Sequence, residues 1–348
     1  MKTIVILTVN ILYFYTVYTL QCLDSTGKPV DWFIIYKIPK IRKSKNSLVK
    51  EGYGFYYMDV NTPKFELSQY GIDTTKHALY YTLQQIYGAK PSSILYGMYN
   101  DQTPNKKIHE ANGHSKGVVA FDDQQGYWLV HSTPHFPPYI HDGYSWPESA
   151  RVYGQIFLCV TYDSYPNIDQ IGTQFLYNYP DFYNYSIPIK MRKKYPNMYS
   201  ALSGKKEKFP HHSSIINLIS SYSTTFTSFA KDKKFGQDLY HDLVAPFYKS
   251  DMRTETWENG KGQMGSNCSQ YKVLNVALVG MTDVIQFEDT KDHSKWGITD
   301  SGYVCIGDIN RESSQFRRNG GTVCFNNHNV WKTFNSLILH VENCNSFP

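Results

Sequence analysis

The tripeptide His-Ser-Lys occurs twice in this chain, at residues 114–116 and again at residues 293–295. A short linker follows each copy, and then a run that begins Gly-Tyr and continues with apolar residues, at 126–134 and at 302–310. Runs of this kind are typical of buried strands. A motif that recurs with its strand in both halves of a chain predicts two similar units, divided near residues 165–210, whose motifs meet at one centre.

Several further segments carry strand or helix signals. The expected strands are 31–37, 117–121, 127–130, 155–162, 214–219, 272–280 and 302–306. The expected helices are 228–243 and 331–339, where apolar side chains recur at helical spacing. Strands mixed with helices predict an α/β or α+β fold. The locally basic segments are interpreted as solvated loops and a helix start: 41–50, 103–110, 190–208 and 231–234.

The composition indicates a folded protein with a sizeable core. The chain has 348 residues, of which 16% are aromatic and 19% charged, and this is not a disordered composition. Because no linker interrupts it, residues 21–348 are expected to form one domain of two half-repeats, roughly 22–165 and 210–344. The net charge is +5, and 12 histidines add to it in acid, which suits a polyanionic partner.

The N-terminus predicts a secretory signal peptide over residues 1–20. Lys2 is followed by an apolar stretch from Ile4 to about Leu20. The alternative is a single N-terminal anchor helix, which Asn10 and several tyrosines disfavour. After cleavage of the signal peptide, no stable membrane association is expected.

Six cysteines are present, an even number, and they form no zinc-type spacing. In a secreted protein they predict three disulfides, for which fifteen pairings exist. Cys305 and Cys324 bracket a polar loop, which favours a local bridge between them. Two sequons, at Asn184 and Asn267, could accept glycans in that compartment.

The doubled tripeptide predicts phosphodiester chemistry. On a strand, residues i and i+2 share a face, so His114 would project with Lys116 and His293 with Lys295. One neutral imidazole can attack phosphorus to form a phosphohistidine, the other can protonate the leaving oxygen, and the lysines can hold the phosphate. These four side chains supply every group the reaction needs, so no metal or other cofactor is expected.

Two alternatives compete with this interpretation. The tripeptides could be coincidental surface sequences. Alternatively, four histidines could form a zinc site: His114, His131, His135 and His293. No motif such as HExxH accompanies them, which argues against zinc.

Longer motifs surround the tripeptides, and they are Asp31-Trp32-Phe33 with Tyr36-Lys37, Gly113-His114-Ser115-Lys116-Gly117, Trp128-Leu129-Val130-His131-Ser132-Thr133-Pro134, Phe136-Pro137-Pro138, Val273-Leu274-Asn275-Val276, Asp292-His293-Ser294-Lys295-Trp296 and Gly307-Asp308-Ile309-Asn310-Arg311. Together they resemble the deoxyribonuclease II family. The resemblance runs from about Cys22 to Cys344.

This resemblance implies a phospholipase D-like fold of two pseudo-symmetric, sheet-containing halves with the active site at their junction. It implies a metal-independent acid endodeoxyribonuclease, secreted or lysosomal, that leaves 3′-phosphate and 5′-hydroxyl ends. By analogy His114 is the nucleophile and His293 the general acid, although the order could be reversed. His131 matches a third important histidine of the family. A homodimer is compatible with the resemblance, but nothing in the sequence specifies an oligomeric state.

The resemblance also implies the disulfides Cys22–Cys159, Cys268–Cys344 and Cys305–Cys324. One departure is that the first tripeptide is His-Ser-Lys where the family usually has His-Thr-Lys. Asp300 has a spacing found in the wider superfamily, but the first half lacks its counterpart, so Asp308 and Asn310 are the better supporting candidates. Core packing is the favoured role of three tryptophans beside the motifs, and stacking on DNA bases is the alternative: Trp32, Trp128 and Trp296.

Two other functions remain open at this stage. The His-Lys pairs do not choose a substrate, so a phospholipase D-like esterase acting on lipids is the second candidate. A non-catalytic, DNA-binding or effector paralogue is the third, and the intact pairs argue against it.

Overall fold

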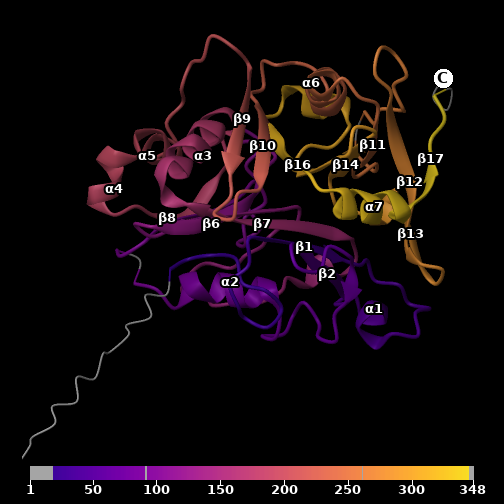
Figure 1. Ribbon diagram of the computed structural model, residues 1–348, viewed down its shortest axis with the longest axis horizontal. Helices are drawn as coiled ribbons and strands as arrows, with labels where there is room; N and C mark the ends of the chain where they lie inside the picture. The colour runs from indigo at the N-terminus through magenta and orange to yellow at the C-terminus, as the bar shows by residue number, and fades with distance from the viewer. Residues whose placement is uncertain (1–18, 91, 261, 345–348) are drawn as a thin grey trace, which may run out of the picture.

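Two large sheets, one below the other in Figure 1, make up most of the chain. The computed structural model describes residues 19–90, 92–260 and 262–344. The predicted signal peptide lies outside these residues apart from Thr19 and Leu20. The predicted mixed α/β class is confirmed, because helices accompany both sheets.

The first sheet has eight strands in the order β3-β2-β1-β7-β6-β5-β4-β8, and all its neighbours are antiparallel. The strands are β1 (Trp32–Lys37), β2 (Phe55–Asp59), β3 (Glu66–Leu67), β4 (Leu95–Asn100), β5 (Lys116–Phe121), β6 (Gln125–His131), β7 (Gln155–Asp163) and β8 (Phe182–Ser186).

The second sheet has the order β13-β12-β11-β14-β15-β16-β10-β9, with β17 paired to β12, and only β11 and β12 are parallel among its described pairs. The strands are β9 (Ser213–Ile219), β10 (Thr225–Lys231), β11 (Met252–Glu255), β12 (Val273–Thr282), β13 (Ile285–Glu288), β14 (Trp296–Thr299), β15 (Tyr303–Gly307), β16 (Gly320–Asn326) and β17 (Ile338–Val341).

Five strands of each sheet correspond. The order β1-β7-β6-β5-β4 in the first sheet is matched by β10-β16-β15-β14-β11 in the second. Strands β5 and β14 each follow a His-Ser-Lys tripeptide, and β6 and β15 are the Gly-Tyr strands. The internal repeat seen in the sequence is therefore a repeat of strand order.

The helices are α1 (Ser47–Glu51), α2 (Ala78–Tyr87), α3 (Ser164–Asn178), α4 (Ile189–Lys194), α5 (Pro196–Leu202), α6 (Ala245–Tyr248) and α7 (His328–Leu337). Helix α2 packs in a second core, on the far face of the first sheet, whereas α3, α5 and α7 contribute buried side chains to the core between the sheets. Short 3₁₀ turns lie at η1 (Glu148–Arg151), η3 (Asp289–Lys291) and η4 (Ser313–Arg317), and a π-turn at η2 (Tyr240–Val244).

The main core lies between the two sheets. Trp32 of β1 packs against Phe325 of β16 with ring centroids 5.3 Å apart, and the indole of Trp296 donates to the Tyr36 hydroxyl over 3.1 Å. The alternate residues of β1, such as Phe33, face a second core under α2. Because β1 is buried on both faces, its sequence is a continuous apolar run instead of an alternating one.

The three tryptophans beside the motifs belong to this core. Trp32 and Trp296 are completely buried and Trp128 is 4% exposed. Their rings are therefore packed in the core and are not accessible for stacking on DNA bases. Core packing is also the role that the sequence analysis favoured.

The predicted strands all occur, but the predicted helix over 228–243 is wrong. Residues Thr225–Lys231 form β10, and a turn then leads to η2. The apolar spacing that suggested a helix joins residues of two different elements. Residues 231–234 were interpreted as solvated, yet Lys231 is fully buried. The second predicted helix begins earlier, as α7, and ends before β17.

Three disulfides join Cys22–Cys159, Cys268–Cys344 and Cys305–Cys324, the same pairs that the family resemblance implied. Within the described ranges, no helix is both long and apolar enough to cross a bilayer.

Candidate active site

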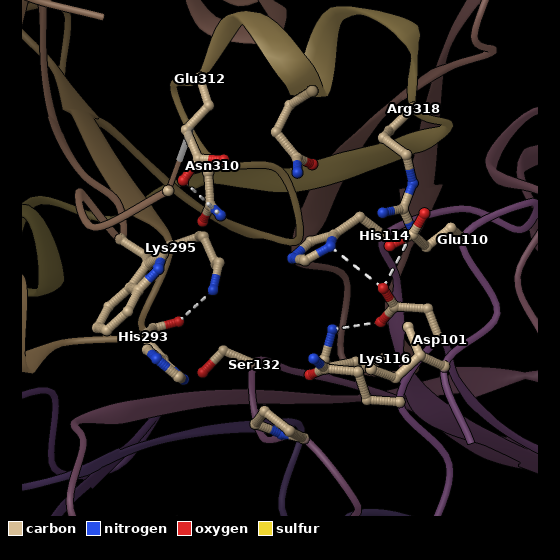
Figure 2. Close-up of a pocket in the computed structure, with 16 residues that line it drawn as sticks. Asp101, Glu110, His114, Lys116, Ser132, His293, Lys295, Asn310, Glu312 and Arg318 are labelled. Carbon is tan, nitrogen blue, oxygen red and sulfur yellow. Dashed lines mark hydrogen bonds and ion pairs between the residues drawn. The ribbon is translucent and has the colours of Figure 1, made fainter. Parts of the chain in front are cut away.

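The two tripeptides lie in the connections that lead into equivalent strands. Lys116 is the first residue of β5, so His114 precedes the strand, and the whole second tripeptide precedes β14. The expectation that both tripeptides lie within strands is therefore wrong by one to three residues. The strand entrances nevertheless meet where the two sheets adjoin, and both tripeptides face one cleft (Figure 2).

This cleft has a volume of about 280 Å³. Its polar lining comes from both halves: Asp101, Gln102, Glu110, His114, Lys116, Ser132, His293, Lys295, Asn310, Glu312, Gln315 and Arg318. All four side chains that the sequence singled out for catalysis are among them. The structure thus brings together residues that are 179 positions apart, from His114 to His293.

Asp101 organises the half-site of the first tripeptide. Its Oδ1 accepts from Lys116 Nζ at 2.5 Å, and its Oδ2 lies 3.2 Å from His114 Nδ1 and 3.0 Å from Arg318 Nη2. Burial opposes ionisation of this carboxyl, but Lys116 and His114 outweigh it and hold the Asp101 pKa well below its usual range. A carboxylate at Nδ1 leaves Nε2 of His114 directed into the cleft (Figure 2).

Aromatic rings hold the second histidine. Tyr153 stacks on His293 with centroids 4.2 Å apart and planes at 9°, and Trp257 meets the same imidazole edge-on at 4.0 Å. Lys295 Nζ donates to the His293 carbonyl at 2.5 Å.

One difference between the two half-sites falls at the position two residues after the strand partner of each tripeptide. Tyr99 lies opposite Gly117 and Glu255 opposite Trp296, and each of these partners follows the lysine of its tripeptide. Two residues further along, Asp101 and Trp257 therefore correspond. The first half places a carboxylate where the second places an indole.

Burial keeps both imidazoles neutral in the free protein. Burial, followed by the charge of Lys116, lowers the pKa of His114 to about 3. Burial and the charge of Lys295 lower the pKa of His293 to about 2. Burial, with Lys116 nearby, also lowers the pKa of Lys295 to about 7. A bound phosphate, being negative, would favour the protonated form of each of these groups.

His131 does not line the cleft. It is fully buried, with its ring 5.4 Å from the ring of Phe157 and 5.6 Å from that of Phe136. Its Nδ1 accepts the backbone N–H of Thr133 at 3.2 Å. His131 thus shapes the turn that carries Ser132 to the cleft, and this is a positioning contact.

The two supporting candidates lie beside the cleft in different ways. Asn310 lines it and approaches Glu312 Oε1 at 3.4 Å. Asp308 is 7% exposed, and burial raises its pKa to about 7 although Lys116 opposes this rise. Asp300 lies outside the cleft, where it pairs with Arg253 at the surface.

The remaining predicted positions lie elsewhere. His135 Nδ1 donates to the Thr103 carbonyl at 2.8 Å. The described residues contain no group of His, Cys, Asp or Glu side chains arranged to hold a metal ion. The zinc alternative therefore has no geometric support. Asn184 lies in β8 and Asn267 in the segment before β12, and their glycosylation stays a prediction.

Sequence reasoning missed four residues that contact the histidines or their partners: Asp101, Tyr153, Trp257 and Arg318. Asp101 had a usable signal, because it directly follows a buried apolar strand. Arg318 had none, since the contact with Asp101 spans 217 residues.

Comparison with known proteins agrees with this geometry. The sequence model described as Deoxyribonuclease II matches residues 21–344. The chain belongs to the deoxyribonuclease II family. It is 40% identical over 331 residues to Plancitoxin-1 of Acanthaster planci, covering 93% of this chain and 92% of that one. It is 38% identical to Deoxyribonuclease-2-alpha of Rattus norvegicus, covering 93% and 95%, and 36% identical to Deoxyribonuclease-2 of Caenorhabditis elegans, covering 93% and 94%.

Membership in this family identifies the protein as a deoxyribonuclease, a hydrolase that acts on DNA. The lipid esterase and the non-catalytic alternatives are set aside by it. The two matched sheets are the two halves of the family's phospholipase D-like fold, and the cleft lies at their junction.

Proposed function

We propose that this protein is an acid endodeoxyribonuclease that hydrolyses DNA through a phosphohistidine on His114, without a metal ion. The observation that carries the proposal is the pairing of His114 with Asp101, directly across the cleft from a histidine that no such carboxylate orients among the described contacts. A carboxylate at Nδ1 fixes the tautomer and keeps the Nε2 lone pair available for attack.

In the first step, His114 Nε2 attacks phosphorus and the bond from phosphorus to the 5′ oxygen breaks. That oxygen takes a proton from His293, and a 5′-hydroxyl end leaves. Lys116, Lys295 and Arg318 line the cleft and neutralise the phosphate oxygens.

In the second step, water attacks the phosphohistidine while His293 accepts its proton. The bond between phosphorus and nitrogen breaks, which leaves a 3′-phosphate and restores both imidazoles. Two lysines and an arginine already supply the positive charge that a metal would bring, which is why we propose metal-independent catalysis.

Plasmid cleavage tests the activity. At about pH 5 with EDTA, the wild-type protein should nick and cut the plasmid, and His293→Ala and His114→Ala should lose cleavage by about 10⁴-fold or more. The new 5′ ends should accept phosphate from a polynucleotide kinase without prior phosphatase treatment. Wild-type protein that is folded but inactive under these conditions would contradict the proposal.

A substrate with sulfur in place of the bridging 5′ oxygen tests the two roles. A thiolate leaves without protonation, so this substrate should restore cleavage by His293→Ala and not by His114→Ala. Rescue of His114→Ala instead would reverse the assignment.

The three disulfides require an oxidising folding environment, and we propose a secreted or lysosomal location in keeping with the acid preference. The homodimer stays a prediction, which sedimentation of the purified protein checks.

A further inference from the structure

Two lysines outside the catalytic cleft are completely buried. Lys37 ends β1 and Lys231 ends β10, and neither side chain is exposed to solvent. A buried ammonium is costly unless polar groups surround it. Each of these ammonium groups should therefore be surrounded by hydrogen-bond acceptors, and each of them is.

Both ammonium groups donate to three backbone carbonyls. Lys37 Nζ binds the carbonyls of Ala150, Arg151 and Tyr153 at 2.7, 2.6 and 2.8 Å, which we call the Lys37 cradle. Lys231 Nζ binds the carbonyls of Gln315, Phe316 and Arg318 at 2.9, 3.2 and 2.6 Å, which we call the Lys231 cradle.

The two cradles are equivalent in the internal repeat. In each, the accepting carbonyls are at positions i, i+1 and i+3, and they follow or overlap a 3₁₀ turn, η1 or η4. Lys37 pairs in register with Gln155, the first residue of β7, and Lys231 pairs with Gly320, the first residue of β16. The two halves thus share the buried lysine, the spacing of its carbonyl acceptors and the strand register of the lysine. These shared features indicate that the same structural element occurs once in each half.

Each cradle leads directly to the histidine of the other half. Gly154, the residue after the Lys37 cradle, accepts the backbone N–H of His293 at 3.0 Å. Asn319, the residue after the Lys231 cradle, accepts the backbone N–H of His114 at 2.8 Å. The contacts thus cross between the halves.

The side chain of the last residue in each cradle also contacts the half-site of the other half. The Tyr153 ring stacks on His293 at 4.2 Å, and Arg318 Nη2 lies 3.0 Å from Asp101 Oδ2, the oxygen that faces His114. Each cradle, together with the residue after it, therefore contacts the opposite half-site twice, through the backbone N–H of that half-site's histidine and through a side chain that touches the imidazole or its carboxylate partner.

We propose that Lys37 and Lys231 are positioning residues, each of which holds in place the loop that orients the catalytic histidine of the opposite half. The proposal rests on the proposed roles of His114 and His293. In a lysine, three donors on one nitrogen can satisfy three carbonyls at once. Without it, these buried carbonyls lose their partner, and the loop must move to reach other donors.

The test compares Lys37→Met with Lys231→Met in the full chain. Each substitution should lower kcat on the order of 100-fold per folded molecule, with little change in KM, because a displacement of about 1 Å costs that much. In protein with isotope-labelled histidines, Lys37→Met should shift the NMR side-chain resonances of His293 and leave those of His114. Lys231→Met should do the reverse.

The two lysine variants serve as controls for each other. A general loss of stability would not shift the resonances of His293 alone in one variant and those of His114 alone in the other. Lys40→Met is the surface control, since Lys40 only pairs with Glu51 at 3.4 Å among its described side-chain contacts. Wild-type kcat in either variant, or resonance shifts that do not cross between halves, would overturn the proposal.

If Lys37→Met does not fold, Lys37→Arg tests the same positioning role. Lys37→Arg keeps the positive charge but cannot place three donors from one nitrogen, so the loop must shift. It should give a smaller loss of kcat with the same shift at His293, and unchanged His293 resonances would refute the positioning role. If His114→Ala and His293→Ala retained cleavage, the proposed function itself would fail, whatever the lysine variants do.

Discussion

Asp101 gives His114 a carboxylate partner, which the equivalent residue of the second half-site does not give His293. It ties His114 to Lys116 and Arg318, whereas the equivalent Trp257 offers His293 only a ring edge. Because its negative charge raises the His114 pKa against the effect of burial, it makes that imidazole the more basic nucleophile.

Asp101→Asn should therefore lower kcat at every pH, by about 10²–10⁴-fold. The His114 pKa should fall further, so any acid limb that reports protonation of this imidazole should move to lower pH. The variant should also be less stable by about 3–5 kcal/mol, because buried cations lose their counter-ion. Asp300→Asn, at the surface pair with Arg253, is the matched control. Steady-state kinetics and urea unfolding check both effects.

The pH profile follows from Lys295 and the histidines. Lys295, with a pKa of about 7 in the free protein, is charged below that pH and neutral above it, so phosphate binding weakens as pH rises. Both imidazoles are neutral above about pH 3, and the acid histidine gains its proton only as pH falls. We expect kcat/KM to fall steeply above pH 7. In Lys295→Arg, which stays charged, KM should vary less between about pH 6 and 8. A flat wild-type profile up to pH 8 would be inconsistent with these pKa values.

At the scale of the elements, the connections into β5 and β14 position the histidines. The segment before β5 passes close to two neighbouring backbones. A Cβ on Gly113 would lie 1.9 Å from the Asn178 carbonyl oxygen and 3.1 Å from that of Asn319. Only glycine permits this approach, so the backbone beside His114 has little freedom.

Gly113→Ala should displace the first tripeptide from the Asn319 carbonyl. We expect a loss of kcat on the order of 100-fold, with substrate binding less affected. Gly88→Ala, at the end of α2, is a suitable control, because its added Cβ would approach only the Gln84 carbonyl oxygen, at 3.3 Å. Unaltered kcat in Gly113→Ala would show that this close approach does not position His114.

At the scale of the whole molecule, the disulfides close loops of very different length. Cys22–Cys159 spans 137 residues, and Cys305–Cys324 spans 19 between paired strands. All four cysteines are fully buried, so replacing either pair by alanine removes comparable packing.

Loss of the longer bridge should destabilise the protein more. In the chain-entropy description, the short loop contributes about 3 kcal/mol and the long one about 5 kcal/mol. Urea unfolding of the two double-alanine variants should therefore differ by about 2 kcal/mol. Equal losses would indicate that native-state contacts, and not loop closure, determine the effect.

Local patterns predicted much of the fold and of the site. Buried strands such as β1 and β7 contain runs of apolar and β-branched residues that are long enough to identify each strand from the sequence. The two tripeptides identified the four catalytic candidates. The wrong helix prediction over 228–243 and the wrong prediction that Lys231 is solvated have the same physical origin. Strand β10 is buried on both faces, so its residues show no alternation, and its last residue is a charged one whose partners are 84 to 87 residues away.

The sequence by itself determined the chemistry and the internal repeat, because both depend on short motifs and on residues that are neighbours along the chain. The tertiary structure alone decided how the two half-sites differ and what holds them. Asp101, Arg318 and the two lysine cradles act across distances of many residues, and such contacts arise only when the sheets pack together. Hydrogen bonds and charge pairs reach a few ångströms, so their energies depend on that packing and not on position in the chain.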